Sequence, residues 1–366
     1  MLRQARATLV NKMAALDVST LEPRLIMAPR SFARRIAPAL LLAVLAPVAA
    51  EFLLGDFTIR NLPIIVVLLP LYGCGALLIR EVARRARRGW PSIVLLGAGY
   101  SLFEEGFLTQ SLFNPNYVGQ RLLDYGYVPL LGTSLNWSLF VLSIHVVWSI
   151  ATPILIAEGV ASDRRTRPWL ETPGLVMTTL LFLLGCAATA LYSLKSSPFV
   201  ATTPQFVAVG LLVLLAICGA FTIESRAEAG DLRAATRRSN APRAVWVFLV
   251  TLALGITFML AESVLRDRGM PPILSVITRV ACEATAASLI LSWSRRPRWT
   301  AGHYLAISAG TTLTYAVIGL TAFLHGHTNL GAPTDRIDIA GQVALASAVF
   351  VLIWWGARRS RLVVTS

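Results

Sequence analysis

The stretch from Trp90 to Phe113 reads WPSIVLLGAGYSLFEEGFLTQSLF and is long and apolar enough to cross a bilayer as a helix. Two adjacent carboxylates, Glu104 and Glu105, interrupt it. An ionisable side chain at the centre of a membrane costs about 2.5–3.5 kcal/mol on insertion scales, so such residues are found with partners or beside water. The stretch therefore predicts a transmembrane helix that carries a buried polar site.

The composition of the whole chain is that of a membrane protein. Hydrophobic residues make up 55% of the 366 residues and charged residues only 14%, which is too apolar for an ordinary soluble domain. We expect an all-α fold, a polytopic transmembrane helix bundle of about ten spans. The cysteines lie inside apolar runs and predict neither a disulfide framework nor a metal site. They are Cys74, Cys186, Cys218 and Cys282.

Ten apolar runs have the length of a membrane span. Small residues at helical spacing occur within several of them and favour close contact between helices in lipid. The runs lie at about 36–54, 61–79, 91–112, 135–157, 173–194, 204–223, 244–263, 271–293, 302–324 and 338–357. The small-residue pairs are Gly73 and Ala76, Gly97 and Ser101, Gly185 and Thr189, and Gly341 and Ala344.

The basic residues predict the orientation of these spans. If the N-terminus lies inside, the cytoplasmic arms and loops hold 26 Lys and Arg residues and the outer side holds 6. Cytoplasmic loops of membrane proteins carry such an excess. We therefore expect a multi-pass protein of the plasma (inner) membrane with both termini cytoplasmic. The same residues predict contact with anionic lipid headgroups at the cytoplasmic face rather than with nucleic acid.

Three regions follow from this layout. A basic cytoplasmic N-terminal arm covers 1–35, a four-span bundle with the acidic pair covers 36–160, and a six-span bundle with short basic cytoplasmic loops covers 161–366. One alternative stays open at the N-terminus. Translation from Met27 followed by cleavage after Ala50 would resemble the processing of a signal peptide and would leave nine spans.

The ionisable residues within the spans fall into one layer. Counted at 1.5 Å per residue, Glu104, Glu105, His145, Arg279 and Glu283 lie roughly 11–18 Å below the outer boundary. We therefore expect a shared polar pocket, in which Arg279 pairs with Glu283 or bridges to one of the adjacent glutamates. Successive helix positions differ by about 100° in direction, so we expect only one of the two glutamates to face the pocket.

At these residues the sequence resembles the CPBP family of intramembrane proteases, which includes CAAX proteases and bacteriocin-processing enzymes. That family carries the motifs E-E-x-x-x-R and F-x-x-x-H on separate transmembrane helices. Glu104 and Glu105 match the acidic pair, but Thr109 stands where the family has arginine. His145 matches the histidine of the second motif, with Val141 in place of phenylalanine.

The third motif of that family, H-x-x-x-N, has the spacing of His325 and Asn329, which lie near the membrane edge. The stretch from Leu71 to Glu158 also looks like a group of uncharacterised bacterial multispan proteins with the same E-E-G signature. The resemblance to the protease family implies that a glutamate activates a water molecule and that the histidines and asparagine support the site.

Three functions remain open on this basis. In an intramembrane protease, Glu104 or Glu105 would be the general base and His145 would polarise the carbonyl group. In a proton- or ion-coupled secondary transporter, the same charges would form a relay. In a non-catalytic membrane protein, they would form a structural ion-pair network, with Arg279 and Glu283 among its members.

Other common chemistries have no support. The sequence holds no H-E-x-x-H zinc motif, no phosphate-binding glycine loop with its lysine and no serine nucleophile elbow. We therefore predict a catalytic set without metal ligands. The sequence identifies neither a cofactor nor a substrate.

Overall fold

The computed structural model describes residues 32–223 and 239–365. Most of the predicted basic arm lies outside these residues, as do the alternative start at Met27 and much of the basic loop at 226–243. Residues 36–366 form one compact unit.

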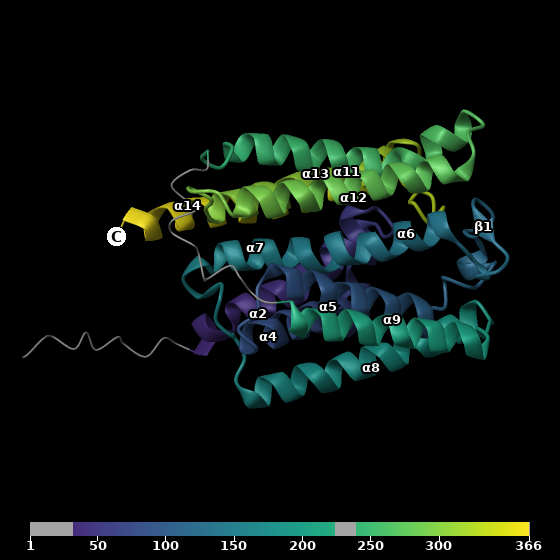
Figure 1. Cartoon of the computed structure of the whole chain (residues 1–366), viewed down its shortest axis with the longest axis horizontal. Coiled ribbons are helices and arrows are strands. Elements are labelled where there is room, and N and C mark those ends of the chain that lie inside the picture. The colour runs from purple at the N-terminus through teal and green to yellow at the C-terminus, as the bar shows by residue number, and fades with distance from the viewer. Residues whose placement is uncertain (1–31, 224–238, 366) are drawn as a thin grey trace, which may run out of the picture. The chain divides into compact units, whose positions relative to one another are not determined.

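Helices dominate the described chain, and the predicted all-α polytopic bundle is confirmed (Figure 1). A two-stranded antiparallel ribbon pairs Tyr127 of β1 with Ser134 of β2 in the loop after the third predicted span. The strands are β1 (Tyr127–Val128) and β2 (Thr133–Ser134). The α-helices are α2 (Phe32–Pro47), α3 (Ile65–Leu68), α4 (Cys74–Arg85), α5 (Trp90–Phe103), α6 (Leu135–Ile144), α7 (Thr152–Val160), α8 (Thr172–Ser196), α9 (Thr203–Thr222), α11 (Ala244–Asp267), α12 (Pro272–Ser294), α13 (Ala301–Leu324) and α14 (Arg336–Thr365).

Nine helices in the described ranges are long and apolar enough to cross a membrane, and each matches a predicted span. The remaining predicted span, 91–112, folds as α5 followed directly by the π-helical turn η5 (Glu104–Leu108). Its two glutamates lower the hydropathy of this helix. It packs along α9 within the bundle.

Four helices of the N-terminal half change from α-helical to π-helical hydrogen bonding partway along. π-Helical turns are rare and frequently occur at functional sites. A proline lies within or beside three of them, and proline lacks the backbone N–H that an α-helix needs. Pro47 precedes the first turn, Pro70 lies within the second and Pro153 follows the fourth. The turns are η2 (Val48–Leu53), η4 (Leu69–Gly73), η5 (Glu104–Leu108) and η7 (His145–Ala151).

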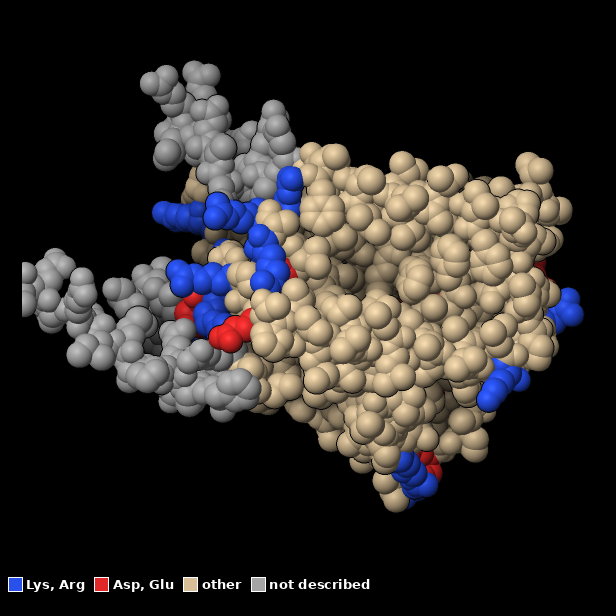
Figure 2. All heavy atoms as spheres, turned by 90° about the horizontal axis from the view of Figure 1, so that it is seen from below, with Lys and Arg blue, Asp and Glu red and all other residues tan. Residues whose placement is uncertain are grey.

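The surface between the two ends of the helices is apolar. Figure 2 shows Lys and Arg gathered mainly at one end, fewer at the other, and a broad band of other residues between them. Within this band large side chains are exposed, among them Leu184 at 63% and Leu215 at 67%. Such a surface is unfavourable in water and suits contact with lipid tails. The protein is therefore an integral, multi-pass membrane protein.

A buried ion-pair cluster joins α4 to α7. Arg84 Nη2 lies 2.8 Å from Oε2 of Glu158, and Arg80 Nε lies 2.9 Å from the other oxygen of that carboxylate. The Arg80 guanidinium also stacks on the Trp169 ring, and Glu81 accepts the backbone N–H of Trp169 at 2.8 Å. Arg80 and Arg84 lie beyond the predicted span at 61–79, yet both belong to α4 and are buried against the neighbouring helix.

Candidate functional site

Glu104, Glu105 and His145 meet inside the bundle. His145 Nε2 lies 3.2 Å from Oε2 of Glu104 and 3.2 Å from Oε1 of Glu105. The three residues are 1%, 5% and 6% exposed. The prediction that a carboxylate lies within hydrogen-bond reach of the histidine is confirmed. The expectation that only one glutamate faces the pocket is wrong.

The local helix geometry accounts for this second result. Both glutamates lie in the π-helical turn η5, whose wider turn reduces the angle between successive side chains. Each glutamate also has flexible methylene groups that let its carboxylate bend toward a common point. In η5, a Cβ on Gly106 would lie 2.6 Å from Val209 of α9, so a larger residue would push the two helices apart.

A backbone contact sets the proton position of the histidine. His145 Nδ1 lies 3.0 Å from the carbonyl oxygen of Val141. A carbonyl can only accept a hydrogen bond, so Nδ1 carries the hydrogen. In the neutral ring Nε2 then has a free electron pair, and this atom faces both carboxylates. In the sequence Val141 stood out only as a departure from the protease motif. Its contribution here is its backbone carbonyl, which holds the His145 ring.

Hydroxyl groups hold the carboxylate of Glu105. Its Oε2 accepts hydrogen bonds from Thr109 Oγ1 at 3.0 Å and from Ser111 Oγ. Trp137 Nε1 donates to Ser111 Oγ at 3.3 Å. Thr109, which replaces the arginine of the protease motif, thus contacts the acidic pair without adding charge. Ser111 and Trp137 were missed because a single serine or tryptophan in an apolar run carries no recognisable signal.

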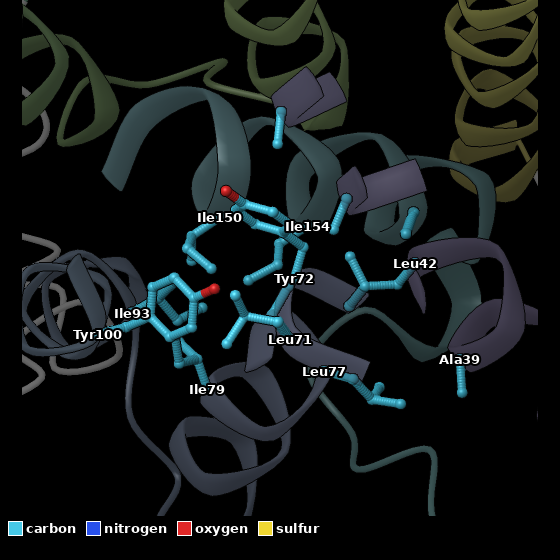
Figure 3. Packing of buried hydrophobic residues seen from close by; sticks show 14 of the residues in the cluster. Ala39, Leu42, Leu71, Tyr72, Leu77, Ile79, Ile93, Tyr100, Ile150 and Ile154 are labelled. Carbon is cyan, nitrogen blue, oxygen red and sulfur yellow. The ribbon is translucent and has the colours of Figure 1, made fainter. Parts of the chain in front are cut away.

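The carboxylate of Glu104 is held differently. Its Oε2 is buried, as are His145 Nε2 and the Tyr100 hydroxyl, and Tyr100 is a side-chain hydrogen-bond partner of Glu104. The Tyr100 side chain lies beside Glu104. The ring centroids of Tyr72 and Tyr100 are 6.0 Å and 6.5 Å from that of His145. Figure 3 shows both tyrosines packed among the buried side chains of Leu71, Ile150 and Ile154.

A third carboxylate extends this polar group toward the loop that follows η2. Glu51 of η2 has Tyr72 of η4 as a side-chain hydrogen-bond partner and lies near Glu104. Its backbone carbonyl accepts the N–H of Asp56 at 2.9 Å. Thus all four π-helical turns contribute a side chain here. In the sequence Glu51 stood near the end of a predicted span, so its contact with the acidic pair was not predicted.

Arg279 belongs to a separate cluster on another face of α6. Its Nη1 donates to the backbone oxygen of Asn136 at 2.9 Å and to Oδ1 of the same residue at 2.5 Å. Its Nη2 lies 3.7 Å from Oε2 of Glu262. Glu283 accepts a hydrogen bond from Ser143 Oγ. The charges of Arg279 and Glu283 interact as expected, but without a direct ion pair among the described residues. No ion pair in that part of the chain joins Arg279 to Glu104 or Glu105.

The residues with the spacing of the third protease motif lie in the loop after α13. His325 is exposed, and its Nδ1 lies 2.7 Å from the backbone oxygen of Thr321. Asn329 donates from Nδ2 to the carbonyl oxygen of Leu54 at 2.5 Å, and its side chain also contacts Asp56. Asn329 therefore contacts the loop after η2, and His325 caps its own helix.

The charge of the central group constrains its chemistry. Two ionised carboxylates and a neutral imidazole would leave two uncompensated negative charges in an enclosed site, which is costly. His145 is the basic side chain that the structure pairs with them among its described residues. At least one positive charge, either a proton or a metal ion, is therefore required between the three side chains.

Comparison with known proteins gives a family but no activity. A family model described as "Uncharacterized membrane protein family" matches residues 40–363. No curated protein and no solved structure matches the chain. The matched region contains every residue of the buried cluster described above. The chain therefore belongs to this uncharacterized membrane protein family.

Proposed function

We propose that this protein is an intramembrane hydrolase that cleaves peptide bonds with a water molecule activated at Glu104, Glu105 and His145. One observation carries the proposal. The Oε2 atom of Glu104 is buried and lies 3.2 Å from Nε2 of His145, whose other ring nitrogen contacts a backbone carbonyl. A carboxylate in that position is available to accept a proton from water.

The two glutamates have different roles in this proposal. Glu105 is restrained by Thr109 and Ser111, so it holds the imidazole in place. Glu104 lacks such donors on Oε2, so it is the general base. In hydrolysis Glu104 takes one proton from water while the water oxygen bonds to the carbonyl carbon of the substrate. The C–N bond then breaks, and the leaving nitrogen receives that proton.

Two neighbouring groups can stabilise the negative oxygen of the tetrahedral intermediate. The buried Tyr100 hydroxyl lies beside Glu104 and can donate a hydrogen bond. His145 can donate from Nε2 when its ring is protonated. Each donor would act in a site from which bulk water is excluded, where hydrogen bonds to developing charge are strongest.

The resemblance to the CPBP proteases supports the same assignment of a glutamate base and a supporting histidine. The departures limit how far the resemblance extends. Thr109 replaces the arginine, and the residues with the spacing of the third motif, His325 and Asn329, lie in an outer loop rather than beside His145. We therefore propose the reaction class, peptide-bond hydrolysis, without adopting the substrates of that family.

Appearance of new N-termini in membrane proteins tests the proposal. Cells that express the wild-type protein would be compared with cells that express Glu104→Gln, Glu105→Gln or a control, Glu283→Gln, by mass spectrometry of protein N-termini. We expect cleavage products with wild type and the control, and none with Glu104→Gln. Detergent-purified Glu104→Gln should unfold at nearly the wild-type temperature. Identical N-termini in wild-type and Glu104→Gln cells would exclude hydrolysis at this site.

A second function, proton-coupled transport, is favoured by a different observation. Ionisable groups continue from Glu104 through Tyr72 and Glu51 to the loop that holds Asp56. Such a line of groups suits stepwise proton movement between the site and the outer side. Proteoliposomes loaded with a pH-sensitive dye would show flux with wild type that Glu51→Gln abolishes. Cleavage without flux would exclude this function.

The proposed location is the plasma membrane with both termini in the cytoplasm. The bias of 26 to 6 basic residues supports this orientation. The same bias supports contact between the arginine-rich end and anionic headgroups of the cytoplasmic leaflet.

A further inference from the structure

When the imidazole is neutral, three electron-pair donors face one another at the central site. Nδ1 of His145 holds the ring hydrogen, because it contacts a carbonyl oxygen. Nε2 is then an acceptor, as are the facing carboxylate oxygens of Glu104 and Glu105 at 3.2 Å. Both Nε2 and the Glu104 oxygen are buried. Acceptors in such an arrangement repel one another unless a cation lies between them.

The spacing of these atoms is that of neighbouring ligands of one metal ion. Nitrogen and oxygen ligands bind zinc at about 2.0–2.2 Å, which puts neighbouring ligands about 3.0 Å apart in an octahedron and about 3.4 Å apart in a tetrahedron. Both contacts of Nε2 measure 3.2 Å. One ligand atom from each of the three residues can be chosen so that all lie within 4.8 Å of one another.

The surroundings also resemble those of metal ligands. A metal-binding histidine usually donates its other ring N–H to a carbonyl or carboxylate, which fixes the ring and its tautomer. Val141 supplies that carbonyl. Ligating carboxylates are themselves hydrogen-bonded, and Thr109 and Ser111 bind the oxygen of Glu105 that faces away from His145. The first and second layers of a site are therefore both present.

We propose that Glu104, Glu105 and His145 bind one divalent transition-metal ion. An imidazole with two carboxylates suits Zn²⁺ or Mn²⁺ and is a poor match for Mg²⁺ or Ca²⁺, which prefer oxygen ligands alone. Three protein ligands leave a coordination position for water, as in catalytic zinc sites. The buried Tyr100 hydroxyl lies beside Glu104 and can hydrogen-bond a ligand at that position.

This inference rests on the site of the proposed hydrolase and changes how the water is activated. A bound ion lowers the pKa of a coordinated water toward neutrality, so the ion takes over much of the task assigned above to Glu104. The competing occupant is a proton on Nε2, which would give an imidazolium between two carboxylates. Metal content distinguishes the two and does not depend on any activity.

The experiment uses the full chain purified in detergent, stripped with EDTA, incubated with excess Zn²⁺ and freed of unbound metal by gel filtration. Elemental analysis should find one zinc ion per chain in wild type and none in His145→Ala. The double variant His325→Ala/His327→Ala, which removes the histidines of the loop after α13, should retain the ion. Ser111→Ala keeps all three ligands and should bind zinc about tenfold more weakly or worse, the usual effect of losing a second-layer contact.

A measurement on wild type alone guards against variants that fail to fold. Co²⁺ added to the stripped protein should give the visible absorption of a four- or five-coordinate ion, which added Zn²⁺ abolishes. Absence of both zinc and this spectrum in wild type would overturn the proposal and leave the proton as occupant, as would retention of zinc by His145→Ala. Bound zinc without peptide cleavage would refute hydrolysis alone, and cleavage by metal-free protein would refute the role of the ion.

Discussion

Nε2 of His145 lies 3.2 Å from Oε1 of Glu105, and each residue lies in a π-helical turn of its own helix. Glu51 and Tyr72, which extend the same polar group, lie in two further π-helical turns. A π-helical turn costs backbone hydrogen-bond quality and persists when its surroundings fix it. Four such turns lie around one buried group. We infer that these irregular turns allow the side chains to reach one another.

The first prediction separates the two charged clusters. Arg279→Ala removes the donor that Asn136 and Glu262 share, so the free energy of unfolding should fall by about 3 kcal/mol, the lower end for a broken buried pair. The lower end applies because the Glu262 side chain is 29% exposed and can be partly hydrated. Denaturant titration in mixed micelles would measure the loss.

Arg279→Ala should leave the central site of Glu104, Glu105 and His145 unchanged. Zinc content and cleavage by the folded fraction of Arg279→Ala should equal those of wild type, because its contacts are to Asn136 and Glu262 rather than to His145. A variant that folds as well as wild type, or that loses zinc while folded, would show that the clusters are coupled. Glu262→Gln should cost less than Arg279→Ala, since it leaves the asparagine contacts of the arginine in place.

The helices could be predicted because hydropathy records which residues must lie in lipid. The depth of each charge along its span followed from the same count, and this brought His145 and the acidic pair to one level. Counting residues along a span does not predict the direction in which a side chain leaves its helix. Arg279 and Glu104 therefore appeared to be candidates for contact, although Arg279 contacts Asn136 and Glu262 whereas Glu104 contacts His145.

The π-helical turns explain the remaining differences between prediction and structure. An ideal α-helix keeps Glu104 and Glu105 about 100° apart, so only one of them was expected to reach the pocket. Proline positions such as Pro70 and Pro153 predicted irregular helices but could not specify that the irregularity is a wider turn. Arg84 was placed in a loop because arginine ends most spans, whereas its contact with Glu158 depends on tertiary packing.

The second prediction concerns the cluster that joins α4 to α7. Glu158→Ala leaves the guanidinium groups of Arg80 and Arg84 buried without this partner, and the free energy of unfolding should fall by about 3–5 kcal/mol. Arg84→Ala combined with Glu158→Ala should cost less than the sum of the two single changes, by about 0.5–3 kcal/mol. The exposed pair Arg121 and Asp124 is the control, and Asp124→Ala should leave the unfolding midpoint unchanged. Strict additivity of the two buried changes would contradict the role of the contact.

The third prediction tests the orientation in the membrane. In a cysteine-free background, a single cysteine at Arg121 should react with a membrane-impermeant maleimide added to intact cells, because its side chain is 77% exposed in an outer loop. A cysteine at Arg165 should react only after the membrane is opened, since the arginine bias places its loop in the cytoplasm. Labelling of position 165 in intact cells would reverse the topology.

The last prediction uses two glycines that were both expected to permit close helix contact. A Cβ on Gly73 would lie 2.1 Å from the carbonyl oxygen of Ala43, a backbone atom that cannot move without moving α2. A Cβ on Gly97 would lie 3.5 Å from a methyl group of Ile150, an ordinary contact. Gly73→Ala should therefore lower the free energy of unfolding by about 1–3 kcal/mol through overpacking.

Gly97→Ala is the matched control for this change. It fills space without a clash and removes backbone freedom from the unfolded chain, so it should be neutral or stabilise by about 0.4–1 kcal/mol. Gly73 also follows Tyr72 in the turn η4, so Gly73→Ala should displace that ring from His145 and weaken zinc binding, while Gly97→Ala should not. Equal stability and equal zinc affinity of the two variants would show that the contact between η4 and α2 does not position the site.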